Sequence, residues 1–227
     1  MTDPLIRPEE IRRRYLGVDS SNVADVLDDL GIHDQGLAPS FGPYPTSAGK
    51  LAGWAYTIRG EPSTYPLGEG DSAKMEACAK LTPGTVSVWS GQGEGVCFFG
   101  ELISIGMKER GCVGALVDGG VRDVDWIGNL DFPVYARYRT PVQSIGRWKV
   151  TGSGIPVRMP GATIPQVLVK PGDFILADSD GAIVVPAEMA EDVLHRAEEL
   201  GAREVQIRTE LAEGLSLSEA LTKFGHV

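Results

Sequence analysis

The sequence predicts an α/β protein, a layered sandwich with mixed β-sheets. The stretch 100–125 reads as a glycine turn, a short helix, a buried strand, a second glycine turn and a new helix start. Its apolar run, 112–117, is bounded by glycines, which is typical of a strand covered on both faces. Beyond Tyr138, short apolar segments alternate with Pro and Gly turns. We therefore expect one βαβ half over 100–133 and a second, largely antiparallel, β-rich layer over 146–186.

Composition limits the class of protein. The chain has 227 residues, 42% of them hydrophobic, enough for a single domain over 1–227, with an arm at 1–17 and a helical segment at 187–227. A net charge of −10 argues against a nucleic-acid partner, because such proteins need a concentrated basic face. No run approaches the roughly 20 apolar residues of a membrane span, so we expect no membrane partner. The 3 cysteines lack CxxC spacing, which indicates reduced thiols and a cytoplasmic location.

The first half of the chain predicts helices and strands separated by segments rich in Pro and Gly. The exposed arm should hold a short basic helix that serves packing or an oligomer contact. Asp19 or Ser20 is positioned to cap the next helix, and Gly31 to end it. The expected elements are helix 11–16, helix 21–30, loop 37–45, strand 51–58, loop 61–69, helix 71–79 with Ala73, Ala77 and Cys78 facing inward, and strand 85–89.

The second half predicts further helices and strands of the same kinds. The acidic face of its long C-terminal helix is the pattern of a solvated surface. The expected elements are helix 101–110, strand 112–117, helix 126–130, strand 133–136, strands at 155–159, 166–169, 174–178 and 182–186, a helix over 188–211 interrupted by Gly201, and a tail at 215–224.

Two short motifs suggest ligands but fail a detailed comparison. The glycine-rich loop 91–95 can present bare amides to an anion, but it lacks GxGxxG spacing and a following Gly-Lys-Ser/Thr, and Glu94 would repel phosphate. We interpret it as an active-site loop. The run DSDG at 178–181 begins like a calcium loop, but the loop's last position is Met189 rather than Glu. A hairpin turn is the better interpretation.

A charged pair, Arg122 and Asp123, directly follows the turn after the buried strand. Residues at the carboxyl end of an α/β strand usually line the crevice in which ligands bind. The helix that begins at Glu101 lies one βα unit away, and its first amides have no partner within the helix. An adjacent Arg-Asp pair is also common as a surface ion pair. Asp118, at the end of the predicted strand, either braces the turn, which we favour, or acts as a ligand.

Short motifs spread over nearly the whole chain match a known family. A further match is the spacing between an acidic residue and a later Arg-Asp pair. In this chain the acidic residue is Glu101, and residues 102–121 separate it from Arg122. The chain resembles the 4-hydroxy-4-methyl-2-oxoglutarate / 4-carboxy-4-hydroxy-2-oxoadipate aldolases and the related regulator of ribonuclease activity A. The family's aldolases carry Asp where this chain has Glu101. The short motifs are SNVAD at 21–25, GWAYT at 53–57, PGTV at 83–86, VDGGVRD at 117–123, PV at 133–134, and PGD at 171–173 followed by ADSDG at 177–181.

The resemblance implies a swivelling β/β/α fold and a divalent-metal pyruvate aldolase that acts on a small oxo acid. Cleavage of a 4-hydroxy-2-oxo acid leaves a pyruvate enolate, whose charge a hard cation such as Mg²⁺ or Mn²⁺ can stabilise. Asp123 is then the expected metal ligand, and Arg122 the residue that grips the substrate carboxylate and carbonyl oxygen. Oxaloacetate decarboxylation is an adjacent activity, because it passes through the same enolate.

The other expected site residues follow from the same resemblance. The amides of Leu102 and Ile103 would bind the substrate carboxylate, and Gly100 would let the substrate approach. Glu101 would act in catalysis, or serve only as a first-turn residue favoured by the helix dipole. Glu204 would reach the metal-bound waters of a neighbouring subunit, which requires a homotrimer or a hexamer of two trimers.

Two classes of function remain open. The first is the metal-dependent lyase, and the second is a non-catalytic binding protein like the regulator of ribonuclease activity A. The retained carboxylate, Arg and Asp favour the lyase. His33, His195 and His226 are scattered along the chain, and we assign them no catalytic role.

Overall fold

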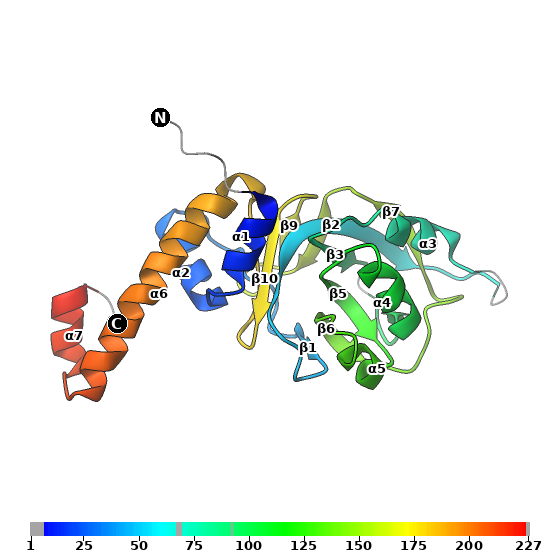
Figure 1. Cartoon of the computed structure of the whole chain (residues 1–227). Coiled ribbons are helices and arrows are strands. Elements are labelled where there is room, and N and C mark those ends of the chain that lie inside the picture. The colour runs from blue at the N-terminus through cyan, green and yellow to red at the C-terminus, as the bar shows by residue number, and fades with distance from the viewer. Residues whose placement is uncertain (1–6, 67–69, 92, 226–227) are drawn as a thin grey trace.

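The structure is a computed structural model that describes residues 7–66, 70–91 and 93–225. The described chain forms a mixed 9-stranded sheet with helices and a small hairpin packed around it, which confirms the predicted α/β class (Figure 1). The main sheet contains β1 (Gly42–Tyr44), β2 (Leu51–Pro62), β3 (Thr85–Ser90), β4 (Cys97–Phe99), β5 (Gly114–Val121), β6 (Val134–Arg139), β7 (Trp148–Ser153), β10 (Phe174–Asp178) and β11 (Gly181–Val185).

The centre of the main sheet is parallel and its flanks are antiparallel. β6, β5, β3 and β2 lie side by side in that order and run parallel, and β4 also runs parallel to β5. β1, β7 and β10 add antiparallel partners to this centre, and β11 pairs with β10. Since β4 and β5 are parallel, their carboxyl ends meet at the same edge of the sheet. The candidate site lies at that edge.

The predicted separate β-rich layer over 146–186 is only partly right. β7, β10 and β11 join the main sheet, and only β8 (Val157–Pro160) and β9 (Gln166–Val169) form a second, 2-stranded sheet. All five residues of β10 are buried, as expected for a strand covered on both faces rather than one with a solvated face. The DSDG run makes the predicted hairpin turn, because Asp178 and Gly181 are paired across β10 and β11.

The helices cover the sheet in groups, visible in Figure 1. One core cluster joins α3, α4 and α5 to the parallel strands, a second joins the β8–β9 hairpin to strands of the same sheet, and a third joins α1, α2 and α6 to β10 and β11. The sheet is therefore the middle layer. The helices are α1 (Pro8–Tyr15), α2 (Ser20–Asp29), α3 (Ser72–Ala79), α4 (Glu101–Lys108), α5 (Val124–Gly128), the 3₁₀ turn η1 (Ala187–Met189), α6 (Ala190–Ala212) and α7 (Leu217–Phe224).

β5 runs further than the sequence predicts, and this corrects the role expected of Asp118. The strand ends at Val121 rather than at Val117, so Asp118 lies inside the strand instead of bracing a turn. The two glycines that suggested a turn allow close packing: an added Cβ would lie 2.6 Å from the Phe98 ring at Gly119 and 2.5 Å from the Tyr138 ring at Gly120. The fully buried Asp118 carboxylate accepts a hydrogen bond of 3.2 Å from Arg137 Nη1.

The described part of the N-terminal arm, 7–17, packs through one apolar side and is otherwise largely exposed. Ile11 and Tyr15 are buried, and the Tyr15 hydroxyl donates a hydrogen bond to the Ala190 carbonyl. Arg14 forms an ion pair with Glu198 on α6. The expected packing role is confirmed, because the apolar side of this short helix covers the start of α6, while most of the other described residues of the arm are exposed as expected.

Three loop and cap predictions also need correction. The predicted loop 37–45 contains β1, and β2 extends into the predicted loop 61–69 as far as Pro62; residues 67–69 lie outside the described chain. The Asp19 side chain does not cap α2, and instead its Oδ1 accepts a hydrogen bond of 2.6 Å from Lys50 Nζ. No helix in the described ranges is long and apolar enough to cross a membrane.

Candidate active site at the carboxyl ends of β4 and β5

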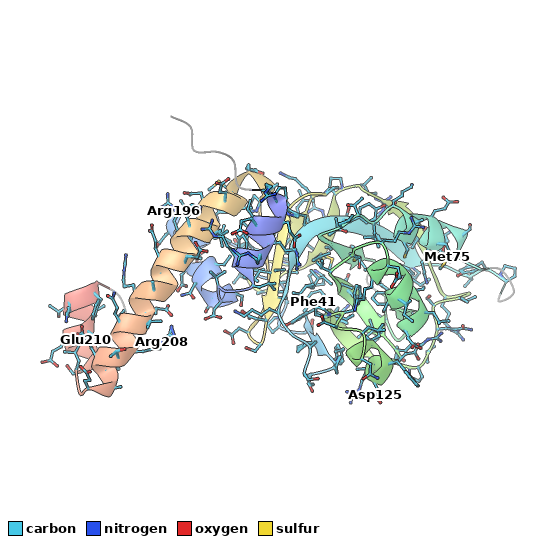
Figure 2. The ribbon with its side chains drawn as sticks, in the orientation of Figure 1. Phe41, Met75, Asp125, Arg196, Arg208 and Glu210 are labelled. Atoms are coloured by element: carbon cyan, nitrogen blue, oxygen red, sulfur yellow. The ribbon has the colours of Figure 1, made fainter. Side chains whose placement is uncertain are left out.

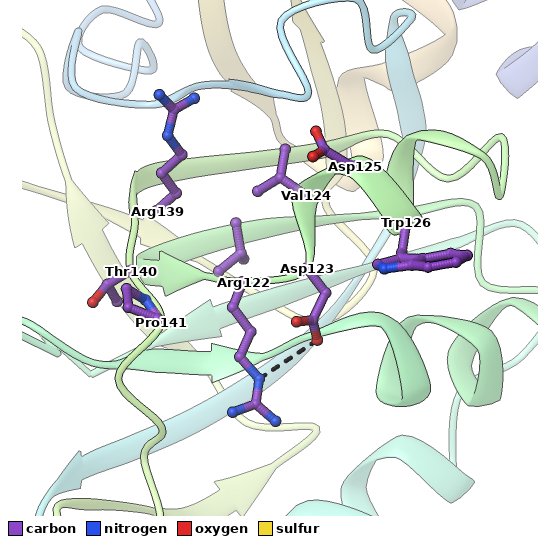
Figure 3. Close-up of a pocket in the computed structure, with 9 residues that line it drawn as sticks. Arg122, Asp123, Val124, Asp125, Trp126, Arg139, Thr140 and Pro141 are labelled. Atoms are coloured by element: carbon purple, nitrogen blue, oxygen red, sulfur yellow. Dashed lines mark ion pairs between the residues drawn. The ribbon is translucent and has the colours of Figure 1, made fainter.

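The turn after β5 presents the Arg122-Asp123 pair at the edge of the sheet. Asp123 has a left-handed backbone (φ 57°), which Asp tolerates better than most residues, and this turns the chain directly into α5. Arg122 Nε lies 3.5 Å from Asp123 Oδ2, as the dashed line in Figure 3 marks. Both side chains are about two-fifths exposed, so they are accessible to a ligand from solvent.

The start of α4 contacts the same carboxylate. The backbone N–H of Glu101 donates a hydrogen bond of 3.1 Å to Asp123 Oδ2. Gly100 comes immediately before and has an extended backbone (φ −141°), so its conformation does not require glycine. The close packing does require glycine at this position, because an added Cβ would lie 2.1 Å from Asp123 Oδ2 and 2.9 Å from Arg122 Cγ. The glycine therefore lets the α4 start approach the charged pair.

These residues line a cavity of about 230 Å³, which we call the inner pocket. It brings together five of the predicted site residues: Gly100, Leu102, Ile103, Arg122 and Asp123. The first-turn amides of α4 have no partners within the helix, so they are suited to an anionic group. The full lining of the inner pocket is Lys74, Cys97, Phe98, Phe99, Gly100, Leu102, Ile103, Arg122, Asp123, Gln143, Ser144 and Ile145.

A second, more open hollow adjoins the inner pocket and shares Arg122 and Asp123 with it. Trp126 and Arg139 stand on its far sides, as Figure 3 shows. Trp126 is largely exposed, although it is a large apolar side chain. The charged pair therefore lies between an enclosed space and an open one.

Lys74 is the charged inner-pocket residue that the sequence reasoning missed. Its helix was expected to bury Ala73, but Ala73 is exposed and Lys74 is 4% exposed. Lys74 Nζ donates hydrogen bonds of 2.8 Å to the Phe98 carbonyl and 2.8 Å to Ser144 Oγ. Burial lowers the pKa of the Lys74 amine, and the Asp71 carboxylate acts in the opposite direction. The available signal was its helical spacing from Ala77 and Cys78, which places all three on one face.

A divalent cation fits this site only as an ion held by few protein groups. Among the described residues, no group of three or more His, Cys, Asp or Glu side chains is placed to hold a metal. Both contacts of the Asp123 carboxylate involve Oδ2, so Oδ1 is the oxygen left for a ligand among these contacts. Mg²⁺ and Mn²⁺ accept one carboxylate with waters and substrate oxygens, whereas a structural zinc site needs a closed ligand set. The donor set thus suits the first kind of ion.

Two predicted residues are not brought into the inner pocket. The Glu101 backbone contacts Asp123, but its side chain is not among the pocket residues. Glu204 lies on α6, where it accepts a hydrogen bond of 2.8 Å from Asn22 Nδ2 and forms an ion pair of 2.7 Å with Arg208. In Figure 2, Arg208 lies on the left part of the molecule, well apart from Asp125 on the right, which is the second residue after Asp123. Within one chain, Glu204 cannot contact the charged pair.

The histidines lie away from the pair as well. His33 contacts Asp28, and His195 lies 3.5 Å from Arg14 on the side of the molecule covered by α1 and α6. His226 is outside the described residues, as is Gln92 of the glycine-rich loop.

Fold and site together define a class: a mixed α/β sandwich with an Arg-Asp pair beside a helix N-terminus, at the carboxyl edge of parallel strands. The family model described as RraA-like, aldolase/RraA, matches residues 20–184. The chain belongs to this family, which confirms the resemblance seen in the motifs.

Individual relatives differ in what their names say. A candidate 4-hydroxy-4-methyl-2-oxoglutarate aldolase of Halalkalibacterium halodurans is 32% identical over 62% of this chain and 65% of its own length. A crystal structure of Streptomyces coelicolor RraAS2, described as an unusual member of the RNase ES inhibitor RraA family, has a TM-score of 0.74 at 28% identity, covering 90% of this chain and 99% of that one. A crystal structure described as one of novel cellulases from gut-associated microbes has a TM-score of 0.80 at 29% identity, covering 90% of each chain.

The match spans only part of several curated relatives. It covers 32%, 65% and 56% of the lengths of the first three relatives. The activities of those whole proteins are therefore not assigned to this chain on the basis of the match.

Proposed function

We propose that the protein is a divalent-metal-dependent lyase that cleaves a 4-hydroxy-2-oxo acid and releases pyruvate, with oxaloacetate decarboxylation as an adjacent activity. The observation that carries the proposal is the placement of Arg122, Asp123 and the α4 N-terminus in one small pocket. This combines a ligand for a hard cation, a planar cation for a carboxylate, and free amides for the same anion. The aldolase name of the H. halodurans relative agrees with it.

Each residue has a distinct task in this proposal. Cleavage transfers the C4 hydroxyl proton to solvent, forms a carbonyl group at C4 and breaks the C3–C4 bond. The electron pair of that bond gives a pyruvate enolate with negative charge on the C2 oxygen, and protonation at C3 then gives pyruvate. Arg122 binds the C1 carboxylate and the C2 oxygen through its guanidinium donors, while the Leu102 and Ile103 amides bind the other side of the carboxylate. Asp123 holds the cation and is itself oriented by the Glu101 N–H. The cation, when bound, supplies further positive charge for the enolate oxygen.

The proposal extends to assembly. Because Glu204 is far from the charged pair within one chain, it can contribute only from another subunit, in a homotrimer or a hexamer. Light scattering at micromolar concentration should therefore give a mass of at least three chains. A purely monomeric protein under these conditions would contradict the role of Glu204.

The direct test is pyruvate release from oxaloacetate and from 4-hydroxy-4-methyl-2-oxoglutarate, measured with Mg²⁺, with Mn²⁺ and with a chelator. We expect pyruvate with either metal and its loss with the chelator. A second candidate function is a non-catalytic regulator of a ribonuclease, which the S. coelicolor structure favours. No pyruvate from either substrate with any divalent metal would reject the lyase and favour that alternative.

A further inference from the structure

Lys74 and Arg122 both line the inner pocket, and the segments that position them lie on opposite sides of β4. β4 pairs with β5 on one side, while on the other side Cys97 forms a parallel bridge with Gln143. Three parallel segments therefore end at the same edge. Arg122 leaves the end of β5 on one side of β4, and Ser144 leaves the bridged segment on the other. The Lys74 ammonium donates one hydrogen bond to Ser144, in the bridged segment, and one to the Phe98 carbonyl, in β4.

The environment of Lys74 does not fully compensate a buried ammonium. An ammonium has three N–H donors, and the two protein acceptors are the neutral Phe98 carbonyl and Ser144 hydroxyl. The Trp148 ring, with its centroid 5.5 Å from Nζ, adds a weaker attraction. Among the described residues, no carboxylate forms an ion pair with Lys74. The nearby Asp71 carboxylate favours the charged amine, but its two oxygens accept hydrogen bonds from the Lys74 and Val150 backbone amides. A buried cation of this kind is stabilised when an anion occupies the space beside it.

The charges of the inner pocket indicate what that anion is. In the proposed function, the C1 carboxylate of the oxo acid is matched by Arg122 and the first amides of α4, which line the inner pocket. The Asp123 charge is balanced by the cation that it is proposed to hold. The charge of Lys74 is thus available to a second anionic group of the same ligand.

We propose that Lys74 is the residue that binds the distal carboxylate of the substrate, so that the preference for oxo acids with a carboxylate at each end depends on its ammonium. The inference rests on the proposed function, because it takes the C1 carboxylate to bind at Arg122. It makes Lys74 a specificity-determining residue and gives Ser144 the task of holding the ammonium in place.

Two stable ligands of equal chain length test the inference. 2-Oxoglutarate carries a distal carboxylate, whereas 2-oxopentanoate ends in a methyl group. Their dissociation constants are to be measured by calorimetry in the presence of Mg²⁺, with wild-type protein, Lys74→Met and Lys74→Arg. Lys80→Met is the matched control, because Lys80 is the exposed residue at the end of the same helix.

We expect wild-type protein to bind 2-oxoglutarate about ten- to a hundredfold more tightly than 2-oxopentanoate, the scale of one charged hydrogen bond. Lys74→Met should remove this preference and leave 2-oxopentanoate binding nearly unchanged, while Lys74→Arg and Lys80→Met keep the preference. Equal affinity of the wild-type protein for both ligands overturns the inference without any variant. Equal weakening of both ligands in Lys74→Met also overturns it and makes Lys74 a structural clamp. If neither ligand binds the wild-type protein, both the inference about Lys74 and the proposed function are rejected.

Discussion

The backbone N–H of Glu101 donates a hydrogen bond to the side chain of Asp123, although the two residues are 22 positions apart in the chain. This contact joins the start of α4 to the turn after β5, and it requires α4 to begin at the edge of the sheet where β5 ends. It gives a physical reason for the fixed spacing between Glu101 and the Arg-Asp pair. Because the donor is the main chain, Glu in place of the family's Asp at this position leaves the contact intact.

Replacing Gly100 should separate activity from stability. In Gly100→Ala, the new Cβ would lie 2.1 Å from Asp123 Oδ2, so the carboxylate must move away from the Glu101 amide. A displacement of this size should lower kcat/KM by about a hundredfold. Gly106→Ala, on the exposed side of the same helix, has open space and should raise stability by about 0.5–1 kcal/mol without affecting turnover. Steady-state kinetics and urea unfolding measure the two effects. Normal activity in Gly100→Ala would show that the carboxylate position is unimportant.

Alkaline pH should destabilise the protein through its buried thiols. Burial raises the pKa of Cys78 from 9.0 to about 12. A raised pKa in the folded state means that the unfolded chain loses this proton first. The thiol therefore contributes its full stability below about pH 9 and loses it as pH rises toward 12.

Cys78→Ala isolates this contribution. Between pH 8 and pH 11, the unfolding free energy measured in urea should fall less in Cys78→Ala than in the wild-type protein. Identical falls in the two proteins would mean that the Cys78 thiol titrates normally in the folded state.

The sequence was sufficient where local chemistry decides the structure. Residues 114–117 of the glycine-bounded run became the first half of β5, although the strand begins two residues later than predicted. The DSDG run became a hairpin turn, because Asp178 and Gly181 pair directly. The prediction that Arg122 and Asp123 lie in a crevice beside the α4 start needed only the order of strand, turn and helix. These features depend on neighbours in sequence.

Sequence reasoning failed where distant packing decides. In the sequence, Gly119 and Gly120 look like a turn. In the structure, these two strand positions require glycine because the Phe98 and Tyr138 rings pack against them. Lys74 looks like a solvated helix residue, but its ammonium is held by Phe98 and Ser144, which a single sequence does not place nearby. The joining of β10 to β2 likewise depends on a partner more than a hundred residues away, as its register Phe174↔Trp54 shows.

Arg122→Lys tests whether the guanidinium does more than carry charge. Lysine keeps the positive charge but loses the planar pair of donors, so we expect turnover to fall by about two to three orders of magnitude while metal binding is retained. Arg110→Lys, at an exposed position in the turn just after α4, is the control and should leave the rate unchanged. Full turnover in Arg122→Lys on the best oxo acid would reduce Arg122 to a structural turn residue.

The central claim is that the Asp123 carboxylate holds a divalent cation, and titration calorimetry with Mg²⁺ and Mn²⁺ tests it most directly. Asp123→Asn preserves the side-chain volume and removes the charge, which a hard cation held by one carboxylate and waters cannot tolerate. We predict measurable binding to the wild-type protein and its loss in Asp123→Asn, with Asp125→Asn, two residues away, behaving as wild type. Equal metal affinity in Asp123→Asn and the wild-type protein would contradict the account.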